Sequence, residues 1–266
     1  MFSLLETLEQ RAELFVAVSD PTPAYWIESP GCRPFLRSLG LFRARQMMPL
    51  LFACWERFTR ENFVSVLQIV TVITLRYSVV GGRNSNVLEP TYHRAARAVL
   101  DGEAGRPEQV FAVLRSLYPE DDQFRQDFRT LTGDTGVPRK KLLRYLLAEL
   151  ERDSSGKACD PDTDPFTLEH ILPENPGEEW GEEFPTSHRD QYVYRLGNLT
   201  LLEAPANRRV KNAAYRDKLA AYGDSAYRLT RAIPELAPEE WTPARVDARQ
   251  ERLAARAVHV WRLDFS

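Results

Sequence analysis

The sequence predicts a mainly α-helical protein in two parts, and three observations support this prediction. Residues 1–153 place apolar side chains at helical spacing, without a visible internal repeat. Residues 154–165, SSGKACDPDTDP, are rich in Ser, Gly, Asp and Pro and lack periodicity, which is typical of a linker. After this segment, two short apolar stretches of strand character stand among helical ones. We therefore expect a helical bundle domain at 1–153, a linker at 154–165 and a second domain at 166–266.

The longest expected helix of the first domain is Glu61–Val80, which Gly81 and Gly82 should end. Its most apolar run, Phe63–Leu75, carries four polar side chains. At 13 residues this run is too short to span a bilayer. We expect a buried helix here.

Shorter helices should complete the first domain. They are expected at Met47–Phe58, Thr91–Leu100, Glu108–Leu117, from residue 119 onward, and at Val137–Arg152. The last of these carries a leucine stripe, which is a mark of helix packing: Leu142, Leu143, Leu146, Leu147 and Leu150.

The second domain mixes strands and helices. FTLEHILP (166–173) and NLTLLE (198–203) are the two expected strands, and an acidic loop and a short helix at Ser187–Arg195 separate them. Helices should follow at Arg208–Tyr222, at Ala226–Ala232 and from Pro243 to about Trp261, the last capped by Thr242.

Composition narrows the class of protein. The chain has 266 residues, of which 43% are hydrophobic and 27% charged, as expected for a soluble globular protein. Its three cysteines form no C-x-x-C pair, so a zinc knuckle or a disulfide framework is not expected. The N-terminus carries acids early and does not read as a signal peptide. We expect a cytoplasmic protein with no membrane partner.

Charge is unevenly spread around the two strands. Residues 160–186 hold nine acids and no Lys or Arg, whereas residues 187–231 hold nine Lys or Arg and four acids. One interpretation is two solvated faces of opposite sign. The other is a basic face for a phosphate backbone, with an acidic loop that keeps polyanions away until something moves.

Three sequence motifs lie on these strands and on the segment that follows them. They are Glu169-His170 on the first strand, Asn198 at the start of the second, and Asn207 nine residues later. Their order and spacing, with Pro173 after the first motif, resemble the ββα-metal or HNH nuclease finger. Taken singly, each has a simpler interpretation: a surface ion pair for His170, a turn residue for Asn198 and a helix cap for Asn207.

The resemblance implies roles for these residues. His170 would be the general base that activates a water, because an imidazole titrates near neutral pH. Glu169 and Asn207 would hold Mg²⁺, with Mn²⁺ as a substitute, through hard oxygen ligands. Asn198 would bond backbone groups near the first strand and fix the geometry of the histidine.

The resemblance also implies double-stranded DNA as the partner. Arg195, Arg208, Arg209 and Lys211 would neutralise phosphates while the helix of the finger lies against the minor groove. Asn212 would touch a metal-bound water or a phosphate.

A longer stretch of sequence resembles one particular family. LEHILPEN, then LGNLTLLEAPANRRVKNAAYRDK, and the helical segment before them are similar to the C-terminal HNH domain of GmrSD-type restriction and phage-defence proteins. Fuller members of that family carry an N-terminal ParB-like nucleotide-hydrolysing domain with a D-G-Q-Q-R-type motif. This chain shows no such motif, so we expect either a fragment of a longer protein, which we favour, or a reduced member of the family.

The expected function is that of a Mg²⁺-dependent DNA endonuclease or nickase acting on foreign DNA. The alternatives are a non-catalytic DNA-binding or assembly module with a degenerate finger, and a helical adaptor without a basic face.

Overall fold

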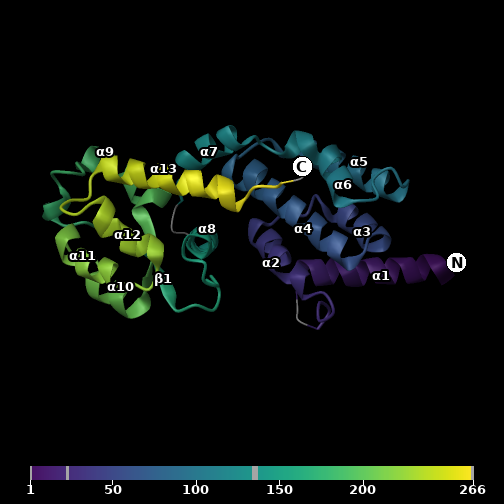
Figure 1. Ribbon diagram of the computed structural model, residues 1–266, viewed down its shortest axis with the longest axis horizontal. Coiled ribbons are helices and arrows are strands. Elements are labelled where there is room, and N and C mark those ends of the chain that lie inside the picture. Colours follow the sequence, from purple (N-terminus) through teal and green to yellow (C-terminus); the bar gives the residue numbers. More distant parts are fainter. Residues whose placement is uncertain (1, 22–23, 134–136, 265–266) are drawn as a thin grey trace. The chain divides into compact units, whose positions relative to one another are not determined.

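We describe a computed structural model of the protein, in which residues 2–21, 24–133 and 137–264 are placed. The chain is mainly helical, as predicted (Figure 1). The elements are α1 (Phe2–Ser19), α2 (Arg33–Phe42), α3 (Met48–Arg57), α4 (Arg60–Thr74), α5 (Leu88–Leu100), α6 (Pro107–Leu114), α7 (Asp121–Arg129), α8 (Val137–Ser155), β1 (Phe166–His170), α9 (Thr186–Val193), β2 (Leu199–Glu203), α10 (Ala204–Val210), α11 (Tyr215–Gly223), α12 (Arg228–Leu236) and α13 (Pro243–Val260).

The chain forms two compact units. Unit 1 is Met1–Phe124 with Trp261–Ser266, and unit 2 is Arg125–Val260. This division falls earlier than the predicted linker at 154–165, because α8 packs with the second part of the chain. Arg144 of α8 donates to the carbonyl oxygens of Phe166 and Pro161, at 2.6 and 2.8 Å. The segment 154–165 is therefore a connection inside unit 2.

The core helix of unit 1 is α4, which continues as a π-helix over Leu75–Val80. Together, Arg60–Val80 is long and apolar enough to cross a membrane by length and composition alone. However, 67% of its most apolar window is buried inside the protein, as in the core helix of a globular domain. The helix is longer than the 13-residue apolar run that the sequence marks, and it is buried as expected.

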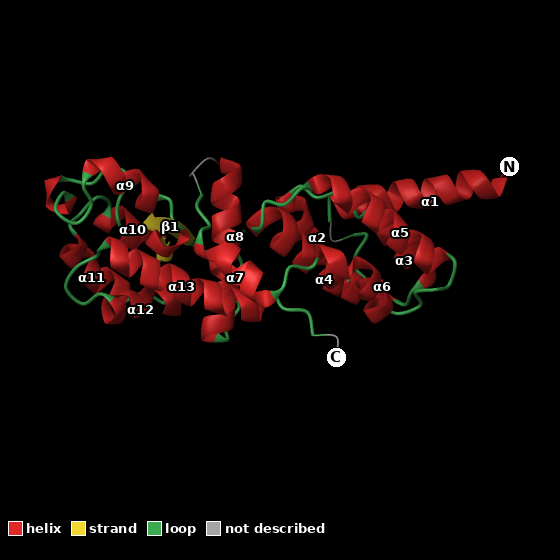
Figure 2. Cartoon of the chain, turned by 90° about the horizontal axis from the view of Figure 1, so that it is seen from above, coloured by secondary structure: helices red, strands yellow, loops and turns green. Residues whose placement is uncertain are grey.

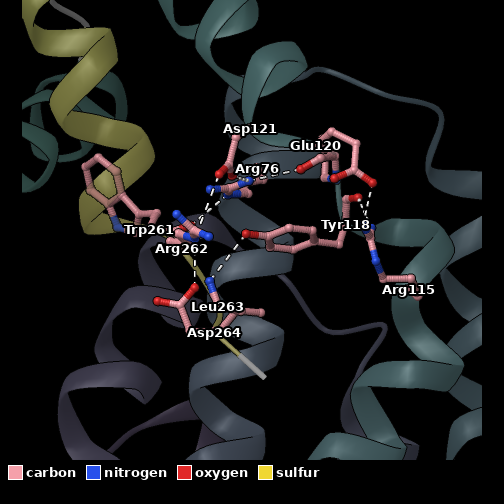
Figure 3. A network of polar contacts seen from close by, with 10 residues as sticks. Arg76, Arg115, Tyr118, Glu120, Asp121, Trp261, Arg262, Leu263 and Asp264 are labelled. Atoms are coloured by element: carbon pink, nitrogen blue, oxygen red, sulfur yellow. Dashed lines mark hydrogen bonds and ion pairs between the residues drawn. The ribbon is translucent and has the colours of Figure 1, made fainter. Parts of the chain in front are cut away.

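A buried arginine ties the C-terminal segment to the rest of unit 1 (Figure 3). Arg76 lies in the π-helix and is fully buried. Its guanidinium donates to the carbonyl oxygen of Trp261 at 2.7 Å and to the carboxylate of Asp121 at 2.8 Å. The guanidinium also lies over the ring of Tyr118, 4.4 Å from the ring centroid. The charge is therefore buried but remains paired with Asp121.

Unit 2 is built around the pair of strands, which lie among helices (Figure 2). β1 and β2 pair antiparallel, with His170 opposite Leu199 and Phe166 opposite Glu203. α10 begins directly after β2 and packs against both strands. The expected single helix at 208–222 is instead two helices, α10 and α11. The chain turns between them at Lys211, whose φ of 39° is rare for a residue other than glycine.

The core of unit 2 lies around the turn after β1. Ile171 and Leu172 are fully buried there, and residues of the helices α9 to α13 pack around them. Trp180 and Trp241 are the largest side chains of this cluster, followed by Tyr215 and Tyr222. The segment that carries Glu169-His170 is therefore held by packing on its C-terminal side.

Candidate active site in unit 2

His170 is the last residue of β1, and its imidazole is only 14% exposed. Its ring lies edge-on to Tyr194, with centroids 6.2 Å apart. The Nε2 atom is buried and has no hydrogen-bond partner in the described part of the chain. The nearest carboxylate oxygen, on Glu174, is 3.9 Å away, which exceeds hydrogen-bond distance.

The surroundings of His170 keep its ring neutral. Burial lowers the pKa of His170 to about 4, since the charged form would lose its hydration. Glu174 opposes this shift, while Lys218 and Lys140 add to it. At neutral pH the imidazole is therefore unprotonated and can accept a proton, but with a pKa of about 4 it is a weaker base than the near-neutral imidazole that the sequence led us to expect.

Asn198 is fully buried, and its side-chain amide makes four hydrogen bonds, two of them to the turn after β1. Its Oδ1 accepts from the Leu172 N–H at 2.8 Å and from the indole N–H of Trp241 at 2.9 Å. Its Nδ2 donates to the carbonyl oxygens of Leu172 at 2.9 Å and Val193 at 3.0 Å. Asn198 thus fixes the backbone two residues beyond His170 and does not itself face a reacting group.

Helix α13 holds the segment that carries Asn198. The buried Arg249 donates to the carbonyl oxygens of Gly197 at 2.8 Å and Leu199 at 2.6 Å, and Gln250 accepts from the Gly197 N–H. A Cβ at position 197 would overlap the Val246 carbonyl oxygen, so only glycine allows α13 to approach this closely.

Glu169 lies in a different environment from His170. Successive strand residues point to opposite faces, and Glu169 points to α11. Its Oε1 accepts from Lys218 Nζ at 2.8 Å and from the Tyr222 hydroxyl at 2.9 Å, and the residue is 4% exposed. Burial raises the pKa of Glu169, and the ammonium of Lys218 opposes that shift. Glu169 is thus one half of a buried ion pair.

Asn207 lies inside α10, so it does not cap a helix as its simpler interpretation would have it. Its Nδ2 donates to the Leu168 carbonyl oxygen at 3.2 Å, which joins α10 to β1. This is the one hydrogen bond of its side chain among the described residues, and Oδ1 remains an acceptor.

The donor set fits the expected Mg²⁺ only in part. The Oδ1 atom of Asn207 is a suitable hard ligand. Glu169 does not fit the role, because its carboxylate already neutralises the Lys218 ammonium and a divalent cation beside that ammonium would be repelled. Among the described residues, no group of three or more His, Cys, Asp or Glu side chains is arranged to hold a metal.

The structure separates the cations of residues 187–231 into two sets. We call Arg208, Arg209 and Lys211 the basic cluster: all three are exposed at the end of α10 and make no hydrogen bond or ion pair with any described residue. Asn212 is exposed beside them. Arg195, expected in the same role, is instead paired with Asp247 at 3.0 Å. The others also contact carbonyl or carboxylate oxygens: Arg189, Arg216, Lys218, Arg228 and Arg231.

Lys218 is the residue of this site that the sequence reasoning missed. It is fully buried on α11, between Tyr215 and Tyr222 at helical spacing. A lysine on the apolar face of a helix is the sequence signal that could have revealed it, because a buried ammonium needs a fixed set of acceptors.

Unit 2 thus combines two antiparallel strands, the helix that follows them and a buried histidine at the end of the first strand. Comparison with known protein families identifies the family of the chain. The family model described as GmrSD restriction endonucleases, C-terminal domain, matches residues 118–256, and the chain belongs to this family. A search of curated proteins found no match. Family membership implies a nuclease function of the restriction type, with DNA as substrate.

Proposed function

We propose that unit 2 is an HNH-type DNA endonuclease domain that hydrolyses one phosphodiester bond at a time. The order β1, β2, α10, with His170, Asn198 and Asn207 at the expected positions along it, supports this proposal. One such site cuts one strand, so a single copy nicks double-stranded DNA.

The observation that carries the proposal is the state of His170. Its ring is neutral, partly buried and has no hydrogen-bond partner for Nε2 among the described residues. The imidazole takes a proton from a water as that water attacks phosphorus, the bond from phosphorus to O3′ breaks, and the departing O3′ takes up a proton from solvent. By the family resemblance, the products carry 5′-phosphate and 3′-hydroxyl ends.

DNA is held by the basic cluster on α10. A cation without an ion-pair partner in the protein breaks no such pair when it contacts a phosphate. Arg208, Arg209 and Lys211 are therefore the residues that neutralise the DNA backbone. Arg195 contributes less, because Asp247 already balances its charge. Asn212 lies next to the cluster and can donate its amide N–H to a phosphate oxygen.

The proposal includes Mg²⁺, or Mn²⁺ in its place, as cofactor, with Asn207 Oδ1 as the ligand that this chain offers. Such an ion would neutralise charge on the phosphate and on the leaving oxygen. In the whole system, we place this domain beside a ParB-like nucleotide-hydrolysing domain in the restriction of foreign phage or modified DNA.

The test is conversion of supercoiled plasmid to open circle. The full chain is incubated with Mg²⁺, with Mn²⁺ or with EDTA, next to His170→Ala and the matched control His188→Ala, an exposed histidine of the same unit. Metal-dependent nicking that only His170→Ala abolishes supports the proposal. DNA binding without cutting, unchanged by EDTA and by His170→Ala, supports the alternative of a DNA-binding module.

A further inference from the structure

The ammonium group of Lys218 makes three hydrogen bonds at the end of β1. The residue is fully buried, and its three N–H donors have three acceptors. Nζ lies 2.8 Å from Glu169 Oε1, 2.9 Å from the His170 carbonyl oxygen and 3.2 Å from the Ile171 carbonyl oxygen. One side chain from α11 therefore holds three consecutive residues of the segment that carries His170.

His170 depends on such contacts for its orientation. Nε2 makes no hydrogen bond to any described residue, so the ring is placed by its backbone and by packing against Tyr194. Asn198 fixes Leu172 from the other side of the turn. Lys218 and Asn198 together leave residues 169–172 little freedom.

The role of Glu169 follows from the same contacts. A buried ammonium is stable only with a charge partner, and removal of either member would leave an uncompensated charge in the core. The Tyr222 hydroxyl donates to the same oxygen, Oε1, and so fixes the carboxylate toward α11.

We propose that Lys218 is a positioning residue for His170, and that Glu169 serves as its buried counter-ion rather than as a metal ligand. This inference rests on the proposed nuclease function for its kinetic consequence, but its structural consequence can be measured without cleavage.

The test uses the full chain and removes both charges together, so that no lone charge stays buried. The variant is Glu169→Gln/Lys218→Met, and the matched control is Arg216→Met/Asp217→Asn, which removes one charge of each sign from exposed positions on the same helix. We expect kcat for plasmid nicking to fall by about 100-fold with KM for plasmid unchanged, because the base is displaced and the basic cluster is intact. The control should match the wild type.

Hydrogen exchange gives the readout that is independent of activity. The amides of residues 170–172 should exchange faster in the double variant and not in the control. Unchanged exchange, or a kcat within about twofold of the wild type, overturns the positioning role. If the wild type does not cut DNA, the proposed function fails while hydrogen exchange still decides this inference.

The double variant also tests the counter-ion role, because it removes the Glu169 carboxylate without leaving a lone charge buried. We expect unchanged Mn²⁺ binding, measured by electron paramagnetic resonance, and an unchanged Mn²⁺ requirement for half-maximal nicking. A loss of about tenfold in Mn²⁺ affinity, or a rise of about tenfold in the Mn²⁺ concentration for half-maximal nicking, would show that Glu169 is a metal ligand. If the double variant shows no cooperative thermal transition, Glu169→Gln/Lys218→Gln, whose amides can hydrogen-bond to each other, takes its place in every measurement.

Discussion

Replacing Asn198 by alanine should destabilise unit 2 more than any surface change can. The substitution removes four hydrogen bonds inside a fully buried site, to Leu172 N–H, Leu172 C=O, Val193 C=O and the Trp241 indole. At about 1 kcal/mol net for each bond, the free energy of unfolding should fall by about 4 kcal/mol. That is a large share of the 5–15 kcal/mol typical of a domain, so partial unfolding at 37 °C is expected.

The assay is urea unfolding followed by far-ultraviolet circular dichroism. Asn175→Ala is the control, because Asn175 is exposed in the same unit and makes no hydrogen bond to a described residue through its side chain. It should change the free energy of unfolding by less than about 0.5 kcal/mol. A loss below about 1 kcal/mol for Asn198→Ala would refute the reasoning that its amide holds the turn after β1.

Three further predictions concern pH, salt and the acidic loop. The pKa of His170 is lowered to about 4, below the 6.5 of an unfolded histidine, so the folded state loses up to about 3 kcal/mol of stability as pH falls from 6.5 to 4. In urea unfolding measured across that pH range, His170→Phe should lack this part of the pH dependence. Changing the basic cluster to glutamine should reduce the slope of log K for DNA against log salt by about 2 to 3, whereas Arg195→Gln should change it by less than about 1. The acidic loop carries four exposed or half-buried acids, Glu178, Glu179, Glu182 and Glu183. If the loop repels DNA, changing all four to glutamine should raise the nicking rate at low salt, and an unchanged rate contradicts that idea.

The domain organisation could be predicted only in part from the sequence. The segment 154–165 has the composition of a linker, yet its first two residues end α8 and the rest is a loop packed against that helix inside unit 2. Composition marks where a chain turns or lacks regular structure. Which of these loops separates compact units depends on the partners of the flanking helices, such as the Glu151 carboxylate of α8 that accepts from the N–H groups of Arg228 and Leu229.

The site residues show the same limit at finer scale. The resemblance to the nuclease finger implied that Glu169 holds a metal and that His170 is the general base. In a strand, neighbours point to opposite faces, and α11 supplies an ammonium on the side of Glu169. The sequence contained the relevant lysine, 49 positions later, but nothing local to Glu169 indicated it.

Local patterns in the sequence determined the elements and the family. Apolar periodicity, caps and glycine stops give the helices, and the longer stretches LEHILPEN and LGNLTLLEAPANRRVKNAAYRDK give the resemblance to the GmrSD-type family that the family match confirms. Only the tertiary structure decided which charged groups are free and which are paired. Arg195 and Arg208 look alike in the sequence, yet Asp247 pairs with Arg195, whereas no described residue makes a hydrogen bond or ion pair with Arg208. Ion pairs form through space between elements that are distant in the chain, and burial then sets their strength.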